Sequence, residues 1–151
     1  MQAATEIGEK LFHESGQLTG ISEFGVNWEK LLQGEATVPA QGARFDITFE
    51  GKLEGERING KFTGIDYMVV RPDGYFDLEL YVTITTTDGA RIAMHESGTL
   101  LRKGDGLAEL FLNMRFSTAH EKYEWINRMP AFARGTVNAA TGEIDVTAFG
   151  A

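Results

Sequence analysis

Two carboxylates, Asp66 and Glu96, occupy positions where the alternation of the chain predicts side chains that point into an apolar interior. Their apolar neighbours in phase are Ile58, Phe62, Met68 and Val70 for the first and Ile92, Met94 and Leu100 for the second. Burial among such residues raises the pKa of a carboxyl group unless the group is paired or hydrogen-bonded. A carboxyl group with a raised pKa is suited to general acid or general base catalysis. We therefore identify Asp66 and Glu96 as candidate catalytic residues.

A structural role is the main alternative for both carboxylates. A β-bulge shifts the parity of a strand by one residue, and Gly64 beside Asp66 is a residue type that often marks a bulge. A buried aspartate also commonly anchors a turn. The alternation does not determine whether Asp66 and Glu96 approach each other. If they do, their titrations are coupled and one of the two pKa values rises.

Arg71 is the third candidate catalytic residue, because it directly follows the apolar run 68–70 and precedes an Asp-Gly turn at residues 73–74. A guanidinium group at this place could pair with Asp66 or hold an oxygen atom of a ligand through two parallel hydrogen bonds. A solvated charge at the end of a strand explains the same position equally well.

Tyr123, Trp125 and Asn127 alternate in a segment that we interpret as a strand after a turn at residues 119–122. Their shared face offers flat apolar area together with polar groups, as small-molecule pockets do. We therefore place all three among the candidate ligand-binding residues. For Trp125 a plain core position is an equal alternative.

The elements that must position these residues are strands. Gly and Asp-Gly turn signals recur every ten to fifteen residues, and between them apolar and polar residues alternate with the period of two that is typical of half-buried strands. The predicted strands cover residues 44–50, 55–70, 76–85, 91–101, 107–116, 131–137 and 143–149. The pattern favours an all-β fold in one domain over residues 1–151: a single antiparallel up-and-down β-barrel of about eight strands, with a sandwich as the alternative. An eight-stranded barrel is wide enough to hold one small ligand.

One segment breaks the alternation and predicts a short helix near residues 22–33. Its apolar residues Phe24, Trp28, Leu31 and Leu32 recur at helical spacing. Asn27 or Ser22 can cap its N-terminus, and Gly34 can end it. A helix here would close one end of the barrel, which makes Trp28 a candidate ligand-binding residue. The alternative is a helix that covers an open seam.

Composition excludes several classes of function. The chain has no cysteine, which rules out disulfides and thiolate chemistry and is compatible with a cytoplasmic location. The net charge of −8 argues against nucleic acid as a partner. The three histidines lack the spacing of metal ligands, and no nucleotide-binding glycine motif is present, so we expect neither a metal nor a cofactor. Residues 1–12 carry charges and no apolar run, so we expect no secretory leader and no membrane partner.

Four features follow one another along the predicted barrel: GKFTGIDYMVVRPDG at residues 60–74, TTTDG at residues 85–89, Gly98, and YEWINR at residues 123–128. Taken together and in this order, they resemble the bacterial domain-of-unknown-function family 3237. The resemblance extends from about residue 42 to residue 149, and it implies a small β-barrel without an assigned activity. Tyr67 stands where tryptophan is more usual in the family, and we add it to the candidate ligand-binding residues because it would change the shape of a pocket.

These observations predict a cofactor-independent enzyme that acts on a small apolar or aromatic metabolite. Its chemistry would be proton transfer of the isomerase, cyclase, lyase or hydratase type, with Asp66 or Glu96 as acid or base and Arg71 on a substrate oxygen. Two alternatives stay open. One is a carrier protein with the same pocket and no chemistry, and the other is a scaffold that forms a homodimer through an apolar face.

Overall fold

The protein is a closed antiparallel β-barrel of eight strands in the computed structural model, which describes residues 8–151. The strands are β1 (Glu9–Glu23), β2 (Ala43–Glu54), β3 (Asn59–Val70), β4 (Phe76–Thr86), β5 (Arg91–Gly104), β6 (Leu107–Ser117), β7 (Ala131–Asn138) and β8 (Glu143–Gly150). Each strand pairs with its neighbours in sequence, and β8 closes the barrel against β1. The prediction of an all-β up-and-down barrel is therefore confirmed. The first seven residues, on which the expectation of no secretory leader partly rests, lie outside the described part.

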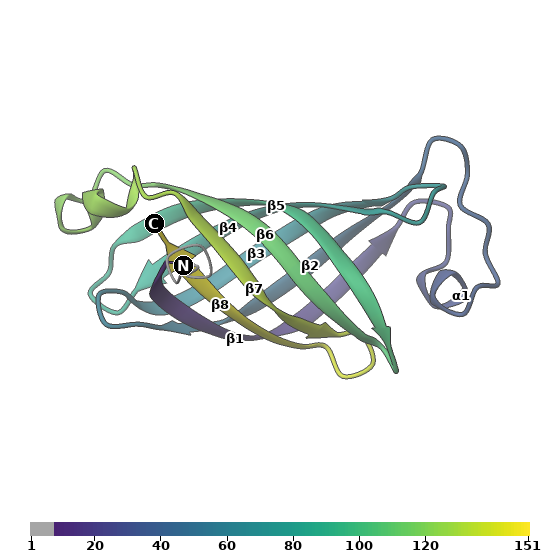
Figure 1. Cartoon of the computed structure of the whole chain (residues 1–151), viewed down its shortest axis with the longest axis horizontal. Helices are drawn as coiled ribbons and strands as arrows, with labels where there is room; N and C mark the ends of the chain where they lie inside the picture. The colour runs from purple at the N-terminus through teal and green to yellow at the C-terminus, as the bar shows by residue number, and fades with distance from the viewer. Residues whose placement is uncertain (1–7) are drawn as a thin grey trace, which may run out of the picture.

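The two ends of the barrel differ (Figure 1). One end carries α1 (Trp28–Leu32) in the long β1–β2 connection, together with the β3–β4, β5–β6 and β7–β8 turns, and we call it the α1 end. The other end carries the C-terminus, the start of β1 and the 3₁₀ helix η2 (Glu121–Ile126), and we call it the terminal end. No helix within residues 8–151 has the length and apolarity that crossing a membrane requires.

Strict alternation places one face of each strand inside the barrel. On β4 the residues of even number from Phe76 to Ile84 form the inner face, and Tyr81 on the outer face is largely exposed. The inner residues nearest the terminal end are packed almost without exposure: Phe12, Leu53, Ile58, Ile84, Ile92, Met94, Met114 and Ile126. Half of the barrel is therefore a solid core that anchors the other half.

β1 is the strand that the alternation did not reveal. Its pairing shifts register between Lys10 and Phe12 on the β8 side and between Leu18 and Gly20 on the β2 side. Each irregularity changes the parity of the strand, so the period of two holds only for the short stretch between them, residues 12–18. Gly64, in contrast, does not mark a bulge, because β2 and β3 pair in one continuous register from Asn59 to Val70.

The two helical segments differ from their predictions. α1 spans only Trp28–Leu32, because β1 continues through Glu23 and Ser22 pairs within the sheet. Asn27 is the N-cap, as expected, and its side chain accepts a hydrogen bond from the Lys30 backbone nitrogen at 2.9 Å. The strand predicted for residues 123–127 is wrong. This segment forms η2. Its aromatic residues alternate in the sequence, but its backbone is helical and not extended.

Glycines on the inner face let the barrel wall coil tightly. A Cβ atom at Gly98 would overlap the carbonyl oxygen of Phe111 on the neighbouring strand, and a Cβ at Gly64 would lie 2.7 Å from the ring of Phe49. Glycine at such places permits close backbone approach, and an aromatic ring can cover the gap.

We expect Gly98→Ala to lower the free energy of unfolding by about 2–3 kcal/mol, because the methyl group can only be accepted if β5 and β6 move apart. Urea denaturation measures the change. Gly20→Ala is the control, since its nearest neighbour is the Thr48 hydroxyl at 3.0 Å, the end of a side chain that can rotate. Equal stability of the two variants would show that β5 and β6 can move apart at little cost in free energy.

Candidate functional site

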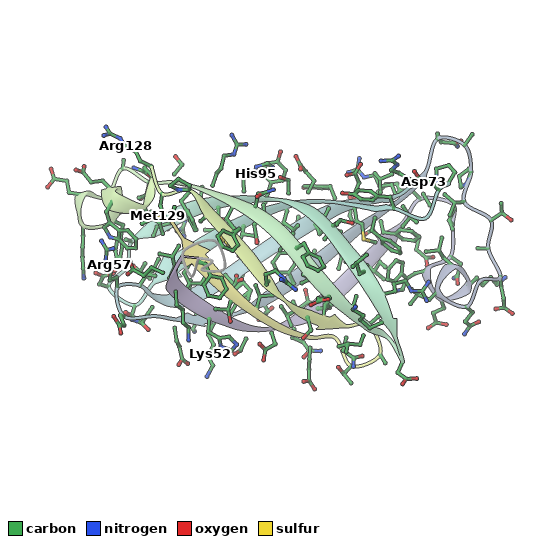
Figure 2. All side chains as sticks on the ribbon, viewed as in Figure 1. Lys52, Arg57, Asp73, His95, Arg128 and Met129 are labelled. Atoms are coloured by element: carbon green, nitrogen blue, oxygen red, sulfur yellow. The ribbon has the colours of Figure 1, made fainter. Side chains whose placement is uncertain are left out.

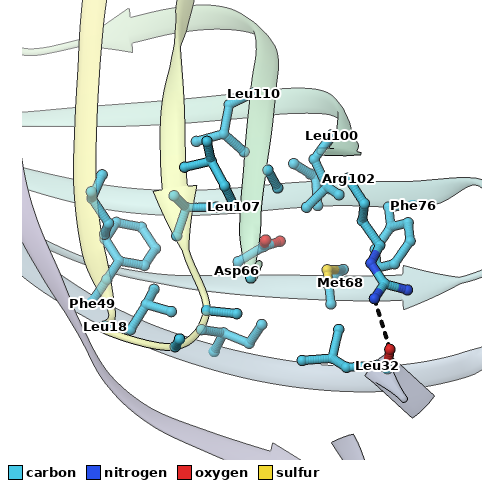
Figure 3. A pocket seen from close by; sticks show the side chains of 18 of the residues that line it. Leu18, Leu32, Phe49, Asp66, Met68, Phe76, Leu100, Arg102, Leu107 and Leu110 are labelled. Atoms are coloured by element: carbon cyan, nitrogen blue, oxygen red, sulfur yellow. Dashed lines mark hydrogen bonds between the residues drawn. The ribbon is translucent and has the colours of Figure 1, made fainter. Parts of the chain in front are cut away.

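The half of the barrel toward the α1 end is hollow. Its cavity has a volume of about 710 Å³ and opens at the α1 end, where its lining includes residues of α1 and of the β5–β6 and β7–β8 turns. Figure 3 shows part of the lining, with Asp66 and Arg102 labelled. The walls are mainly apolar and include Ile47, Phe49, Met68, Phe76, Leu78, Leu80, Leu110, Leu112 and Val146. A concave, largely apolar site of this size is typical of small-molecule binding.

Three buried carboxyl groups line this cavity: Glu14 on β1, Asp66 on β3 and Glu96 on β5. They are the buried acidic residues of the described chain, with 4%, 8% and 3% of their surface exposed. On β5 the inner residues on the terminal side of Glu96, Ile92 and Met94, belong to the solid core and do not line the cavity. The three carboxyl groups thus lie where the hollow half meets the packed half, and we call them the carboxyl floor.

Strand register brings Asp66 and Glu96 to one level of the wall. Asp66 pairs with Leu80 of β4, and Leu80 pairs in turn with Glu96 of β5. Both carboxylates therefore point inward from alternate strands with one leucine between them. The burial expected for both from the sequence is found, and the register answers the question that alternation left open by placing the two residues at the same level, two strands apart.

Asp66 is held by a backbone hydrogen bond. The Glu79 backbone nitrogen donates to Asp66 Oδ1 at 3.0 Å. The bond lies at a gap in the β3–β4 pairing, between the pairs Asp66–Leu80 and Val69–Asp77. Burial raises the pKa of Asp66 to about 7, against the opposing effect of this hydrogen bond. At neutral pH the group is therefore divided between its acid and its base form.

Glu96 is the member of the floor with an unpaired oxygen atom in the described part of the chain. Its Oε2 atom is buried and finds no hydrogen-bond partner among the described residues. Burial raises its pKa well above the ordinary value, and the charges of Glu14 and Asp66 raise it further. Burial alone raises the pKa of Glu14 to about 8. At neutral pH Glu96 and Glu14 are consequently proton donors in an apolar cavity, while Asp66 can accept a proton.

Trp28 is the predicted ligand-binding residue that lines the cavity. It comes from the first turn of α1 and packs edge-on against Phe45, with ring centroids 4.9 Å apart. Its backbone nitrogen donates to Glu23 Oε2 at 2.6 Å. The side chain therefore forms part of the mouth, on a helix tied to the end of β1.

Arg71 and Tyr67 lie away from the cavity lining. Arg71 is exposed in the β3–β4 turn and donates to Asp73 Oδ2 at 2.7 Å, and Figure 2 shows Asp73 at the α1 end. Tyr67 faces outward on β3, where its ring lies 5.9 Å from that of Tyr81 and under the guanidinium of Arg44. The structure thus does not bring Arg71 to Asp66, whose partner is the Glu79 nitrogen.

Tyr123, Trp125 and Asn127 lie at the terminal end, opposite the mouth. The Tyr123 hydroxyl donates to Asp88 Oδ1 at 2.8 Å, and Asn127 exchanges two hydrogen bonds with the backbone of Thr118. The guanidinium of Arg57 lies 3.6 Å above the ring of Trp125, and Figure 2 places Arg57 at this end. These contacts make η2 a plug for the solid half of the barrel.

The sequence reasoning missed several lining residues, among them Glu14 and Arg102. Glu14 lies on β1, whose bulges hide its inward parity, although the pattern Phe12, Glu14, Gly16, Leu18 carries the signal once the register is known. Arg102 lies at the mouth and donates to the Leu32 carbonyl at 2.7 Å, which joins β5 to the end of α1 (Figure 3). Within residues 8–151 no group of histidine, aspartate and glutamate side chains is arranged to hold a metal ion.

A family model described as "Protein of unknown function (DUF3237)" matches residues 26–149. A UPF0311 protein of Rhodopseudomonas palustris (strain TIE-1) is 30% identical over 91 residues, a match that spans 50% of this chain and 60% of that relative. A protein of unknown function from Clostridium acetobutylicum is 21% identical with a TM-score of 0.76, over 95% of this chain and 97% of that one. An enzyme from Penicillium herquei is 21% identical with a TM-score of 0.58, over 93% and 91% of the two chains. These two solved structures share the barrel fold.

Proposed function

We propose that this chain, which belongs to the DUF3237 family of proteins of unknown function, is a cofactor-independent enzyme. Its barrel catalyses proton transfer on a small, largely apolar or aromatic molecule. Isomerisation, cyclisation, elimination and hydration are the reactions within reach of such a site. The observation that supports this most is the carboxyl floor: three buried acids at the base of an apolar cavity, one of them with an unpartnered oxygen.

Glu96 is the proton donor in this proposal and Asp66 the proton acceptor. Glu96 gives its proton to an oxygen or carbon of the substrate, and Asp66, which is partly ionised near neutral pH, removes a proton from a second atom. Transfer of that proton back to Glu96 restores both groups, so the reaction consumes no external acid, base or oxidant. The Glu79 nitrogen holds the Asp66 carboxylate in place meanwhile.

Substrate binding is assigned to the walls and the mouth. Trp28 and the apolar lining surround the molecule, and the solid terminal half of the barrel closes the cavity at its far end. Tyr123, Trp125 and Asn127 support the site from the far end by holding η2, and Tyr67 and Arg71 stiffen the wall and the β3–β4 turn. The cytoplasmic location expected from the sequence is part of the proposal.

The test begins with a ligand. Native mass spectrometry of the purified protein and a thermal-shift screen against apolar and aromatic metabolites identify binders, since a ligand at 100 times its dissociation constant adds about 2.7 kcal/mol of stability. Incubation of each binder with the protein and analysis of the products then shows whether it is converted. Conversion that requires the protein supports the enzyme.

A carrier protein is the second candidate, because a cavity of about 710 Å³ with an open mouth suits storage and release as well as catalysis. It predicts that every binder is recovered unchanged. It also predicts that neutral substitutions of Asp66 and Glu96 leave the affinity for an apolar ligand as it is. A scaffold that forms homodimers predicts no binder at all and a dimer in the native mass spectrum.

A further inference from the structure

The carboxyl floor has no cationic partner of its own. Glu14, Asp66 and Glu96 line the same cavity, and the basic side chain among the described lining residues is that of Arg102. Arg102 lies at the mouth, where the Leu32 carbonyl already takes one of its hydrogen bonds. An ionised carboxylate on the floor therefore has nothing of opposite charge beside it.

Glu96 Oε2 shows that a partner is missing at one defined atom. The atom is buried and without a hydrogen bond among the described residues, and its neighbours across the strands are Leu80 and Met114, which have no donor to offer. A buried acceptor left unpaired destabilises the folded protein. Because Glu96 lines the cavity, a ligand that carries a hydrogen-bond donor can reach this oxygen.

We propose that the carboxyl floor binds the ammonium group of a hydrophobic amine, while the alkyl or aryl part of the molecule fills the apolar cavity toward α1. The inference rests on the proposed function in taking this cavity as the substrate site, and it names the class of substrate. It is tested by binding alone, so that a failure of amine recognition and a failure of catalysis are separate results.

The charges of the site favour an ammonium group over other polar groups. An ammonium has three N–H donors and no acceptor, which complements three carboxyl groups that lack donors from the protein side chains. Its hydrogen bonds to a carboxylate are charge-assisted. Its positive charge balances the negative charge of an ionised carboxyl group on the floor, which has no cationic side chain beside it. An alcohol offers a single neutral donor. A carboxylate ligand adds a further negative charge and is repelled by a chain whose net charge is −8.

The pH dependence follows from the groups that face the site. They are Glu14 from β1, Asp66 from β3 and Glu96 from β5 at the floor, with Glu29, Arg102 and Asp105 at the mouth. β2, β4, β6, β7 and β8 contribute no titratable side chain to the described lining. A bound ammonium favours the ionised floor, so binding releases a proton and the affinity rises with pH.

The experiment compares three probes of one chain length: octylamine, 1-octanol and octanoate. Isothermal titration calorimetry is done on the wild-type protein at about pH 6 and about pH 8, where the amine is fully protonated. At the higher pH we expect octylamine to bind at least about tenfold more tightly than 1-octanol, and octanoate to bind most weakly. At the lower pH we expect the preference for the amine to fall several-fold.

Neutral variants assign this preference to the floor. Glu96→Gln, with Asp66→Asn as a second variant, is expected to reduce the preference for octylamine about tenfold and to leave the affinity for 1-octanol nearly unchanged. Glu50→Gln is the matched control, because Glu50 is exposed on the outer face of β2. It should behave as the wild type, and circular dichroism checks that each variant is folded.

Three results would overturn the inference: equal affinity for octylamine and 1-octanol, a preference for the amine that survives in both floor variants, and no binding of octylamine. Selective amine binding without conversion of any amine supports the inference and counts against the enzymatic proposal. Conversion of a neutral substrate by a protein that shows no amine preference supports the enzyme and overturns the inference.

Discussion

The free energy of unfolding should fall as the pH is raised from about 5 to about 8, a range in which most proteins change little. The cause is the carboxyl floor. Burial raises the pKa of Asp66 to about 7 and that of Glu14 to about 8, and the pKa of Glu96 rises as well. In the unfolded chain all three groups titrate near pH 4. The folded protein therefore binds protons that the unfolded chain has already lost.

The direction of the effect follows from this difference in bound protons. Below about pH 4 both states are protonated and the floor is fully compatible with folding. Between that pH and the pKa values of the folded protein, each increase of one pH unit lowers the free energy of unfolding by up to about 1.4 kcal/mol per group. Above the folded pKa the loss is complete. For Asp66 alone this amounts to about 2–3 kcal/mol between pH 5 and pH 8.

Groups with lowered pKa values do not disturb this window. Asp88 accepts hydrogen bonds from Lys122, Thr86 and Tyr123, and these bonds hold its pKa below the usual range. The pKa of Glu109 is lowered by its hydrogen bond from Arg134. Stability from such groups is lost only as the pH falls through the acidic range, well below the window of the floor.

Urea denaturation at intervals from pH 5 to pH 8 measures the slope, and variants identify its source. Glu96→Gln and Asp66→Asn should each flatten the profile and unfold at higher urea concentration than the wild type near pH 8, because neither side chain can ionise. Glu50→Gln should keep the wild-type slope. A flat wild-type profile would mean that the three carboxyl groups are hydrated and ionised, and it would remove the basis for their role as proton donors.

Much of this fold was predictable because a closed barrel of sequential strands obeys local rules. Period-two alternation reports which side chains point inward, and it identified Asp66 and Glu96 as inward residues from the sequence. The Asp-Gly turns fixed where strands end, at Gly74 and Gly89, both with positive φ. Neither signal needs knowledge of distant contacts.

What escaped prediction depends on contacts between distant parts of the chain. Glu14 lies on a strand whose parity is broken by two irregularities, and those become visible only in its pairing with β2 and β8. The segment at residues 121–126 alternates like a strand, but Tyr123 and Ile126 are buried by a 3₁₀ helix folded against the barrel end. Tertiary packing overrides a short local pattern in such a case.

Once a substrate is known, Glu96→Gln should lower the rate of the chemical step by about 10²–10⁴-fold, the usual contribution of a positioned acid or base. Glutamine keeps the size of the side chain and its acceptor oxygen but has no proton that can be transferred. Asp66→Asn should have a similar effect and should retain the hydrogen bond from the Glu79 nitrogen. Single-turnover measurements of the rate constant of the chemical step across pH provide the comparison.

The pH profile of the rate distinguishes a variant that has lost its catalytic group from a variant that has lost its folded structure. With Asp66 as the base, the wild-type rate should rise with pH through a pKa near 7, because the carboxylate form is the acceptor. Asp66→Asn should remove that limb, whereas Glu50→Gln should preserve both the limb and the rate. The double variant Asp66→Asn, Glu96→Gln should lose no more than a small factor beyond the worse single variant, because the two groups act in one proton transfer. Turnover that persists in the double variant at the wild-type rate would show that the carboxyl floor binds and does not catalyse.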